Sequence, residues 1–215
     1  MLNVALTGNV ASGKSTVSKS FVRWGATLID SDALVAEVQQ PGSDTLTAIA
    51  RQFGESLILP DGSLDRAALR QVILADGAAR ERLNAIVHPA VQVRREAMLV
   101  EARNRGDRIV VSDIPLLFEV LDPSSFDIVI LVESPNSFRH KRLLDRGLSE
   151  REAEQLMAAQ IPSEKKRALA DIVIENRGSL QDLLAELPSR LAQRPQPGPL
   201  EFTAGAPAAV EGAGH

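Results

Sequence analysis

One short stretch near the start of the chain constrains the fold more than any other feature. It fits the pattern G-x-x-x-x-G-K-[ST] and consists of Gly8, Asn9, Val10, Ala11, Ser12, Gly13, Lys14, Ser15 and Thr16. An apolar run at residues 2–6 precedes it, and apolar residues at helical spacing follow it. This order predicts a buried strand, a glycine-rich turn and a helix, the context in which the pattern forms a phosphate-binding loop. A chance glycine turn before a helix is the alternative interpretation.

The residue types of this stretch explain what it can bind. Gly8 and Gly13 allow a tight turn, so that successive backbone N–H groups point at phosphate oxygens. A helix beginning near Lys14 adds the positive end of its dipole. Lys14 can then reach the outer phosphates of a nucleoside triphosphate, and the Ser15 hydroxyl can hold Mg²⁺. The stretch therefore predicts a nucleoside triphosphate site with Mg²⁺.

Length and composition narrow the class of protein. The chain has 215 residues, which suits one α/β domain with an inserted piece. It has no cysteine, which excludes disulfides and cysteine metal sites and fits a reducing compartment. It shows neither a signal segment nor a membrane-length apolar run. The net charge of −4, with no Tyr and one Trp, argues against nucleic acid as a partner. We therefore expect a cytoplasmic protein that binds neither nucleic acid nor membrane.

Apolar segments alternate with helical patterns along the chain. Strands are expected at residues 2–6, 26–29, 108–112, 127–132 and 171–174. The later ones are almost continuously apolar, which is typical of parallel strands covered on both faces. Strands that alternate with helices indicate right-handed crossovers. The expected fold class is α/β, with a five-stranded parallel sheet flanked by helices.

Capping residues predict where several helices begin and end. Asp65 is expected to cap a helix over residues 66–75. Residues 78–104 have a helical pattern that we expect to break at His88-Pro89. Ser134-Pro135 is a helix-start signal, and residues 149–152 form a capping box.

The C-terminal part of the chain carries two further expectations. Residues 179–182 are expected to cap a final helix that ends near residue 192. Residues 195–215 are mostly Pro, Gly and Ala without a period, which predicts a disordered tail outside the catalytic unit.

Three acidic residues lie at the ends of expected strands. Asp30 and Asp32 follow the second strand, on the side where parallel sheets bind ligands, and residues two apart in extended chain face the same way. One of them could accept a proton from an attacking hydroxyl while the other holds substrate or metal-bound water. Alternatively, Asp32 merely caps the next helix. Asp113 ends the third strand in the Walker B arrangement, which usually contacts Mg²⁺, although such acids also serve as caps.

Two further segments allow both a functional and a structural interpretation. Residues 115–119 are apolar and could wall an acceptor pocket or simply pack in the core. Arg139, Arg142 and Arg146 are spaced to share one helix face, either as a solvated face or as a lid that delivers arginine to phosphates. The basic residues 165–167 predict a solvated turn.

Several segments in consistent order resemble the dephospho-coenzyme A kinase family. The resemblance extends from about residue 2 to residue 191. The segments that carry it are residues 6–16, 30–32, 62–66, 86–89, 113–119, 142–143, 160, 170–171 and 174–179. The His88-Pro89 pair and the Pro-Leu-Leu-Phe-Glu run at residues 115–119 separate this family from other small kinases.

The resemblance implies an activity and a set of site residues. It implies a P-loop kinase that transfers the γ-phosphate of ATP to the ribose 3′-hydroxyl of dephospho-coenzyme A. It also implies that Asp32 is the base. The other implied residues are Arg142 and Arg146 in the lid, Asn176 at the adenine, Asp30 at the substrate, and His88, Pro115, Leu116 and Phe118 around the acceptor.

The resemblance further implies how the chain is divided. Residues 1–194 form the kinase domain, with an acceptor-binding helical insertion at about 43–105 and a lid at about 136–168. A monomer or small homo-oligomer is expected. Asn9, Ala11, Ala36 and Arg139 depart from the family pattern, which puts affinity more than reaction type in question.

Two other functions are compatible with the loop. The first is another P-loop kinase, acting on a nucleoside monophosphate or a small metabolite. The second is a regulatory nucleotide switch. No Asn in the chain is followed by Lys, so the guanine-reading motif of GTPases is absent.

Overall fold

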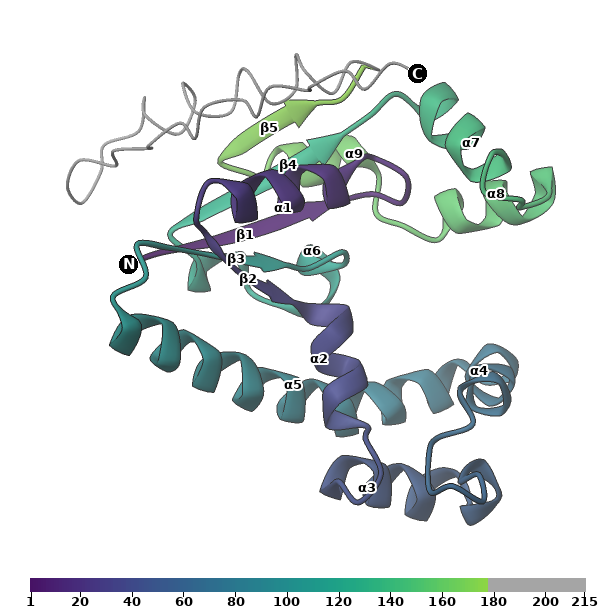
Figure 1. The fold of residues 1–215 in the computed structure, drawn as a ribbon. Coiled ribbons are helices and arrows are strands. Elements are labelled where there is room, and N and C mark those ends of the chain that lie inside the picture. Colours follow the sequence, from purple (N-terminus) through teal and green to yellow (C-terminus); the bar gives the residue numbers. More distant parts are fainter. Residues whose placement is uncertain (178–215) are drawn as a thin grey trace, which may run out of the picture. The chain divides into compact units, whose positions relative to one another are not determined.

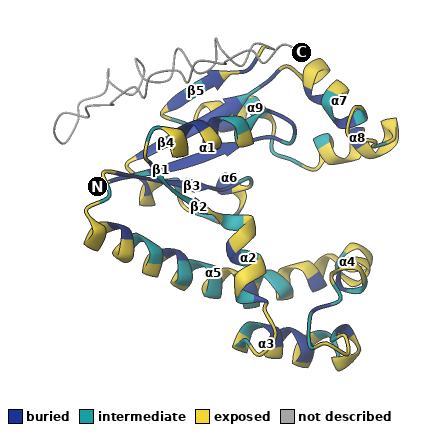
Figure 2. Ribbon diagram, in the orientation of Figure 1, coloured by how far each residue is buried: buried dark blue, intermediate teal, exposed yellow. Residues whose placement is uncertain are grey.

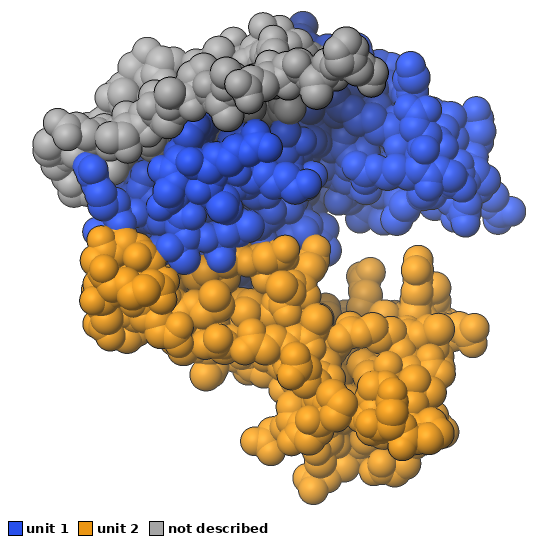
Figure 3. All heavy atoms as spheres, in the orientation of Figure 1, with its two compact units in different colours: residues 1–28, 108–215 blue, residues 29–107 orange. Residues whose placement is uncertain are grey.

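The computed structural model describes residues 1–177, apart from the side chain of Val120 (Figure 1). The described chain forms two compact units, one made of residues 1–28 and 108–177, the other of residues 29–107 (Figure 3). The predicted helical insertion falls within the second unit. The predicted final helix and the predicted tail lie outside the described residues. Every helix in the described part is too short or too polar to span a membrane.

A five-stranded sheet organises the first unit, which contains all of its strands except the last two residues of β2. Its strands are β1 (Leu2–Gly8), β2 (Thr27–Asp30), β3 (Ile109–Asp113), β4 (Ile128–Glu133) and β5 (Ile172–Glu175). They are ordered β2-β3-β1-β4-β5, and β1 pairs in parallel with both β3 and β4. These three strands are buried almost throughout, which explains their continuous apolar sequences. The predicted parallel α/β sheet is confirmed.

The two faces of this sheet pack against different helices. Helix α1 (Lys14–Arg23) contributes Val17 and Phe21, both fully buried, to a core cluster that contains Val4. Ala5, the next residue along β1, belongs to a second cluster with Leu117 of α6 (Leu117–Val120). Successive strand residues point to opposite faces, so the two clusters lie on opposite sides of the sheet. Figure 2 shows that the central strands of the sheet are coloured as buried along most of their length. Burial of a side chain such as Phe21 contributes roughly 1.5–3 kcal/mol to stability.

Three more helices and a short 3₁₀ turn complete the described part of the first unit. They are η2 (Pro123–Ser125), α7 (Asn136–Leu144), α8 (Glu150–Ala158) and α9 (Ser163–Arg167). The capping box predicted for α8 is confirmed. The Ser149 hydroxyl accepts from the Glu152 N–H, and the Glu152 carboxylate accepts from the Ser149 N–H at 2.9 Å.

The predicted cap of α7 is wrong. Pro135, not Ser134, stands at the N-cap position, and no side chain caps the helix. Ser134 is instead buried, and its hydroxyl donates to the Asn176 carbonyl at 2.7 Å. The Ser134 side chain points into the protein and not toward the start of α7. Its hydroxyl therefore bonds to the segment after β5 and does not cap the helix.

The second unit is helical. It contains α2 (Ser31–Val38), α3 (Asp44–Phe53), η1 (Glu55–Leu57), α4 (Arg66–Ala75) and α5 (Gly77–Arg105). Its own core includes Leu46, Ile49, Leu69 and Val87. Asp65 caps α4 by accepting from the Ala68 N–H, as predicted.

The predicted helix break at His88-Pro89 is wrong. Helix α5 runs for 29 residues with Pro89 inside it. A proline removes one helical hydrogen bond and crowds the preceding turn. Buried Val87 and partly buried Val91 pack in the core of the second unit on either side of Pro89, and we attribute the continuity of the helix to this packing.

The predicted solvated turn at residues 165–167 is only partly correct, because Lys165 and Arg167 are exposed but the segment is helical and Lys166 is buried. These residues belong to α9, and Lys166 has no exposed side-chain surface. Its ammonium forms an ion pair with Glu119 at 2.9 Å. Arg167 pairs with Glu133 and Glu175, which lie opposite each other on the neighbouring strands β4 and β5. These ion pairs therefore tie α9 to Glu119 and to the ends of β4 and β5.

Candidate functional site

The phosphate-binding loop connects β1 to α1, as predicted. Its backbone is turned by two residues with positive φ, Ala11 at 59° and Gly13 at 98°. A Cβ at Gly13 would also collide with the side-chain amide of Asn176, so only glycine fits there. Ala11 is the non-glycine residue that takes a left-handed conformation among the described residues. That conformation costs an L-residue roughly 1–2 kcal/mol, which the surrounding contacts must offset.

Side chains from outside the loop hold three consecutive loop carbonyls. Arg139 Nε donates to the Val10 carbonyl at 2.9 Å, and Arg142 Nη1 donates to the Ala11 carbonyl at 2.9 Å. Asn176 Nδ2 donates to the Ser12 carbonyl at 2.8 Å. In a planar peptide the C=O and the following N–H point in opposite directions. Holding these carbonyls therefore directs the intervening N–H groups to the other side of the loop.

Val10 is held at both of its backbone polar groups. Its N–H donates to Gln160 Oε1 at 2.8 Å, and the same oxygen accepts from Arg139 Nη2 at 3.3 Å. Arg139 is only 3% exposed, and burial lowers the pKa of its guanidinium from the usual value. An arginine keeps its charge at neutral pH even so. We call Arg139, Gln160 and their bonds to Val10 the Val10 clamp.

Asn9 joins the loop to α9. It is buried, and its Nδ2 donates to the Ser163 hydroxyl at 2.9 Å. Its Oδ1 is buried without a hydrogen-bond partner among the described residues. A cavity of about 700 Å³ lies beside this part of the loop, bordered by Asn9, Arg139, His140 and Glu154 among others.

Lys14 and Asp113 form an ion pair at the edge of the sheet. Lys14 begins α1, and Asp113 ends β3 opposite Leu6 of β1. Their side chains are 17% and 10% exposed, so the pair is largely shielded from solvent. The acid predicted from the Walker B pattern thus lies beside the loop lysine. The lysine can exchange this partner for phosphate oxygens, which carry more negative charge.

The residues at this edge also suit Mg²⁺. Ser15 supplies a hydroxyl from the first turn of α1, and Asp113 supplies a carboxylate. Both are hard oxygen donors, the type that Mg²⁺ prefers, and the Lys14 contact shows that the carboxylate faces the loop. The donor set therefore fits the ion that the loop implies.

The two aspartates after β2 have different roles in the second unit. Asp30 is the N-cap of α2 and accepts from the Asp32 and Ala33 N–H groups at 2.9 and 3.2 Å. The alternative that Asp32 is the cap is therefore wrong. Asp32 is an exposed residue in the first turn of α2. Because its carboxylate is not needed for capping, it stays available for other chemistry.

The remaining candidate residues lie in several elements. His88 is exposed on α5 of the second unit. Pro115 and Phe118 are partly buried, and Leu116 is 43% exposed. Phe118 packs against the cluster that contains Leu117, so the segment has both a core role and an exposed apolar residue. Core packing thus explains only part of the Pro-Leu-Leu-Phe-Glu run.

The shared face predicted for the three arginines is only partly correct. Helix α7 ends at Leu144, so Arg146 lies beyond it in a turn and is exposed. Arg139 and Arg142 do lie together against the loop. Neither the Val10 clamp nor the role of Gln160 was expected from spacing, because the sequence does not show which backbone groups a distant side chain reaches.

The sheet order, the loop and the lysine–aspartate pair define the class of P-loop enzymes that act on nucleoside triphosphates. A family model described as dephospho-CoA kinase matches residues 2–182. The chain belongs to the dephospho-CoA kinase family and is an ATP-dependent kinase.

Individual relatives agree with this assignment. The chain is 44% identical to a dephospho-CoA kinase of Frankia casuarinae over 87% of this chain and 81% of that one. It is 42% identical to the Geobacter sulfurreducens enzyme, over 89% and 98% of the two chains. It covers 46% of a longer Mycolicibacterium paratuberculosis relative, with 41% identity over 91% of this chain.

A solved structure supports the fold as well. TT1252 from Thermus thermophilus superposes with a TM-score of 0.76 at 35% identity, over 91% of this chain and 98% of that one.

Proposed function

We propose that this chain transfers the γ-phosphate of ATP to the 3′-hydroxyl of the ribose in dephospho-coenzyme A. The proposal rests mainly on the phosphate-binding loop. Side chains from outside the loop hold three of its backbone carbonyls, and the Lys14–Asp113 ion pair lies beside it. Phosphoryl transfer needs positioning and neutralisation of charge more than covalent chemistry. The family assignment supplies the acceptor.

The loop and its neighbours bind the triphosphate in this proposal. Backbone N–H groups of the loop surround the phosphates, apart from those of Val10 and Ser12, which donate to Gln160 and to the Asn9 carbonyl. Lys14 moves from Asp113 to the β and γ oxygens. Ser15 and Asp113 hold Mg²⁺, which neutralises phosphate charge when bound. Arg142 adds positive charge from α7, and exposed Arg146 approaches the phosphates from the turn after it.

Asn176 borders the adenine in this proposal and also shapes the loop. Its amide already connects the Ser12 carbonyl to Arg142, through bonds of 2.8 and 3.2 Å. A nucleotide contact at this residue is therefore linked directly to the position of the loop.

Asp32 accepts the proton of the attacking hydroxyl in this proposal. Its exposure and the capping role of Asp30 support this assignment, because the Asp32 carboxylate can face a substrate without loss of the cap. Asp30 lies two residues away and contacts the same substrate.

The acceptor is bordered by four residues in the proposal: His88, Pro115, Leu116 and Phe118. The exposed apolar surface of Leu116 suits the apolar parts of a coenzyme A precursor. We further propose that the chain acts in the cytoplasm, as a monomer or small homo-oligomer, on small molecules and not on nucleic acid.

The proposal is tested by acceptor preference. ADP release is measured with ATP and Mg²⁺ in the presence of dephospho-coenzyme A, adenosine, AMP or dTMP. We expect strong stimulation by dephospho-coenzyme A alone, with a product phosphorylated at the 3′ position. Stimulation by a monophosphate would move the function to another P-loop kinase. Tight ATP binding with no acceptor dependence would favour a nucleotide switch.

A further inference from the structure

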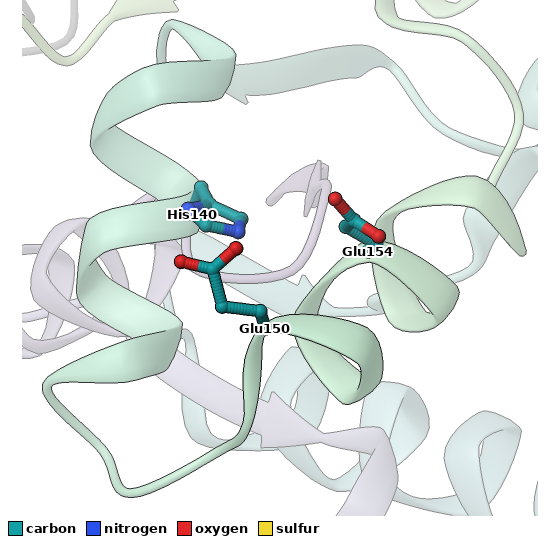
Figure 4. A group of neighbouring side chains, drawn as sticks. All are labelled: His140, Glu150 and Glu154. Atoms are coloured by element: carbon teal, nitrogen blue, oxygen red, sulfur yellow. The ribbon is translucent and has the colours of Figure 1, made fainter.

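Three side chains on α7 and α8 converge outside the residues assigned to phosphoryl transfer. His140 lies on α7, and Glu150 and Glu154 lie on α8 (Figure 4). One ligand atom from each can be chosen so that all three atoms lie within 4.8 Å of one another. The two glutamates are four residues apart, which places them on one face of α8.

Within residues 1–177, no ion pair offsets the charge of this trio. None of the three side chains has an ion pair or a side-chain hydrogen bond with another of the described residues. Two carboxylates in proximity repel each other, and a cation between them removes that repulsion. The half-buried imidazole offers a neutral nitrogen ligand to the same cation.

We propose that His140, Glu150 and Glu154 form a binding site for one divalent transition-metal ion, with Zn²⁺ as the best fit. An imidazole with two carboxylates suits Zn²⁺ and its neighbours in the periodic table, whereas Mg²⁺ prefers oxygen ligands alone. The site is therefore chemically distinct from the Mg²⁺ position at Ser15 and Asp113.

The geometry can close around such an ion. Donors of a tetrahedral zinc site lie about 3.4 Å apart when the bonds are about 2.1 Å long. The present separations are within 4.8 Å, and both glutamates are exposed, so rotation of their side chains can bring the oxygens closer. His140 and Glu154 also border the cavity of about 700 Å³, which gives the ion a path of entry and room for a water ligand.

The ion would join α7 to α8. Helix α7 also carries Arg139 and Arg142, which hold the carbonyls of Val10 and Ala11. Metal binding would therefore restrain the segment that positions the phosphate-binding loop, without a ligand from the loop itself.

The test is a metal titration of the untagged full-length chain without nucleotide. Zn²⁺ is titrated calorimetrically and Co²⁺ by its visible absorption, both with Mg²⁺ in excess. We expect saturation at one ion per chain, a visible Co²⁺ band that reports nitrogen and oxygen ligation, and a rise in melting temperature. Absence of saturable binding would overturn the proposal.

Variants identify the ligands. His140→Ala and Glu154→Gln should each weaken Zn²⁺ binding about tenfold or more. Glu164→Gln removes an exposed acid of α9 outside the trio and should leave the affinity unchanged. Glu154 is exposed, so its variant stays informative even if His140→Ala folds poorly. Equal affinity in wild type and both ligand variants would place the ion elsewhere, at His88 or His215 for example, and would refute the site.

Discussion

Lys14 carries the single charge on which we expect phosphate transfer to depend most. Lys14→Ala should lower kcat by at least about a hundredfold, because it removes a cation from the β and γ phosphates. The variant also leaves Asp113, whose side chain is 10% exposed, without this partner, so the melting temperature should fall while the apolar core keeps the fold. Turnover with dephospho-coenzyme A and the melting temperature are the measurements.

Lys19→Ala is the matched control for this variant. Lys19 is an exposed lysine on the same helix, and its loss should change neither quantity appreciably. Normal turnover of Lys14→Ala would show that the proposed mechanism is wrong.

Asp30 and Asp32 form a natural pair for a test of the base. Asparagine caps helices about as well as aspartate, so Asp30→Asn should preserve α2. Asp32→Asn removes the proton acceptor and should reduce kcat by roughly 10²–10⁴ while ATP binding is retained. We expect Asp30→Asn to act mainly on KM for the acceptor. Comparable kcat values for the two variants would reject Asp32 as the base.

Residue-level prediction from the sequence succeeded where a motif fixes local geometry. Gly13 and Lys14 are placed by the loop pattern, and Asp113 by the end of an apolar strand. Arg139 was expected as one of three arginines on a helix face and noted as a departure from the family pattern, but no partner was expected for it. Its bond to the Val10 carbonyl joins positions 129 residues apart, and no local pattern encodes such a contact.

At the scale of elements, α7 determines the shape of the phosphate-binding loop through the Val10 clamp. Arg139→Gln removes the buried guanidinium that donates to Val10 and Gln160. Hydrogen bonds to charged groups contribute about 1.5–3 kcal/mol each, and we expect part of this to appear as weaker ATP binding, by about tenfold. The measurements are the Kd for ATP, and kcat and KM determined separately.

Substitution by lysine tests whether geometry or charge matters. Arg139→Lys keeps the charge but cannot donate to two oxygens in a fixed fork, so it should not restore affinity. Lys141→Ala, an exposed change on the same helix, should leave ATP binding intact. Wild-type affinity in Arg139→Gln would mean that the clamp does not position the loop.

Helix α9 is held by an ion pair between fully buried Lys166 and partly exposed Glu119, and the two members should differ in their effects. Glu119→Gln leaves the fully buried Lys166 ammonium without its partner and should lower the free energy of unfolding by ~3 kcal/mol. Lys166→Met replaces the cation with an apolar chain of similar length and should change it by less than about 1 kcal/mol. Urea unfolding of both variants measures this difference. A larger loss in Lys166→Met than in Glu119→Gln would contradict the argument.

Elements were predicted well where local signals agree with packing and poorly where they compete. The cap of α4 and the capping box of α8 depend on residues within one turn, and both are confirmed. Pro89 lies inside α5 although a proline locally disfavours a helix, and Val87 and Val91 on either side of it pack in the core of the second unit. Ser134 bonds to a carbonyl 42 residues away. Such contacts depend on the folded arrangement, which a sequence pattern does not specify.

At the scale of the whole molecule, we expect the catalytic part of the chain to end by residue 194, and truncation tests this. The family match ends at residue 182, and Asn176 is bonded to Ser12, Ser134 and Arg142. A chain that ends after residue 194 should therefore keep kcat within about twofold and keep its melting temperature. A chain that ends after residue 175 lacks Asn176 and should lose ATP binding and stability together. A large loss of turnover in the longer truncation would assign residues 195–215 a role in the reaction.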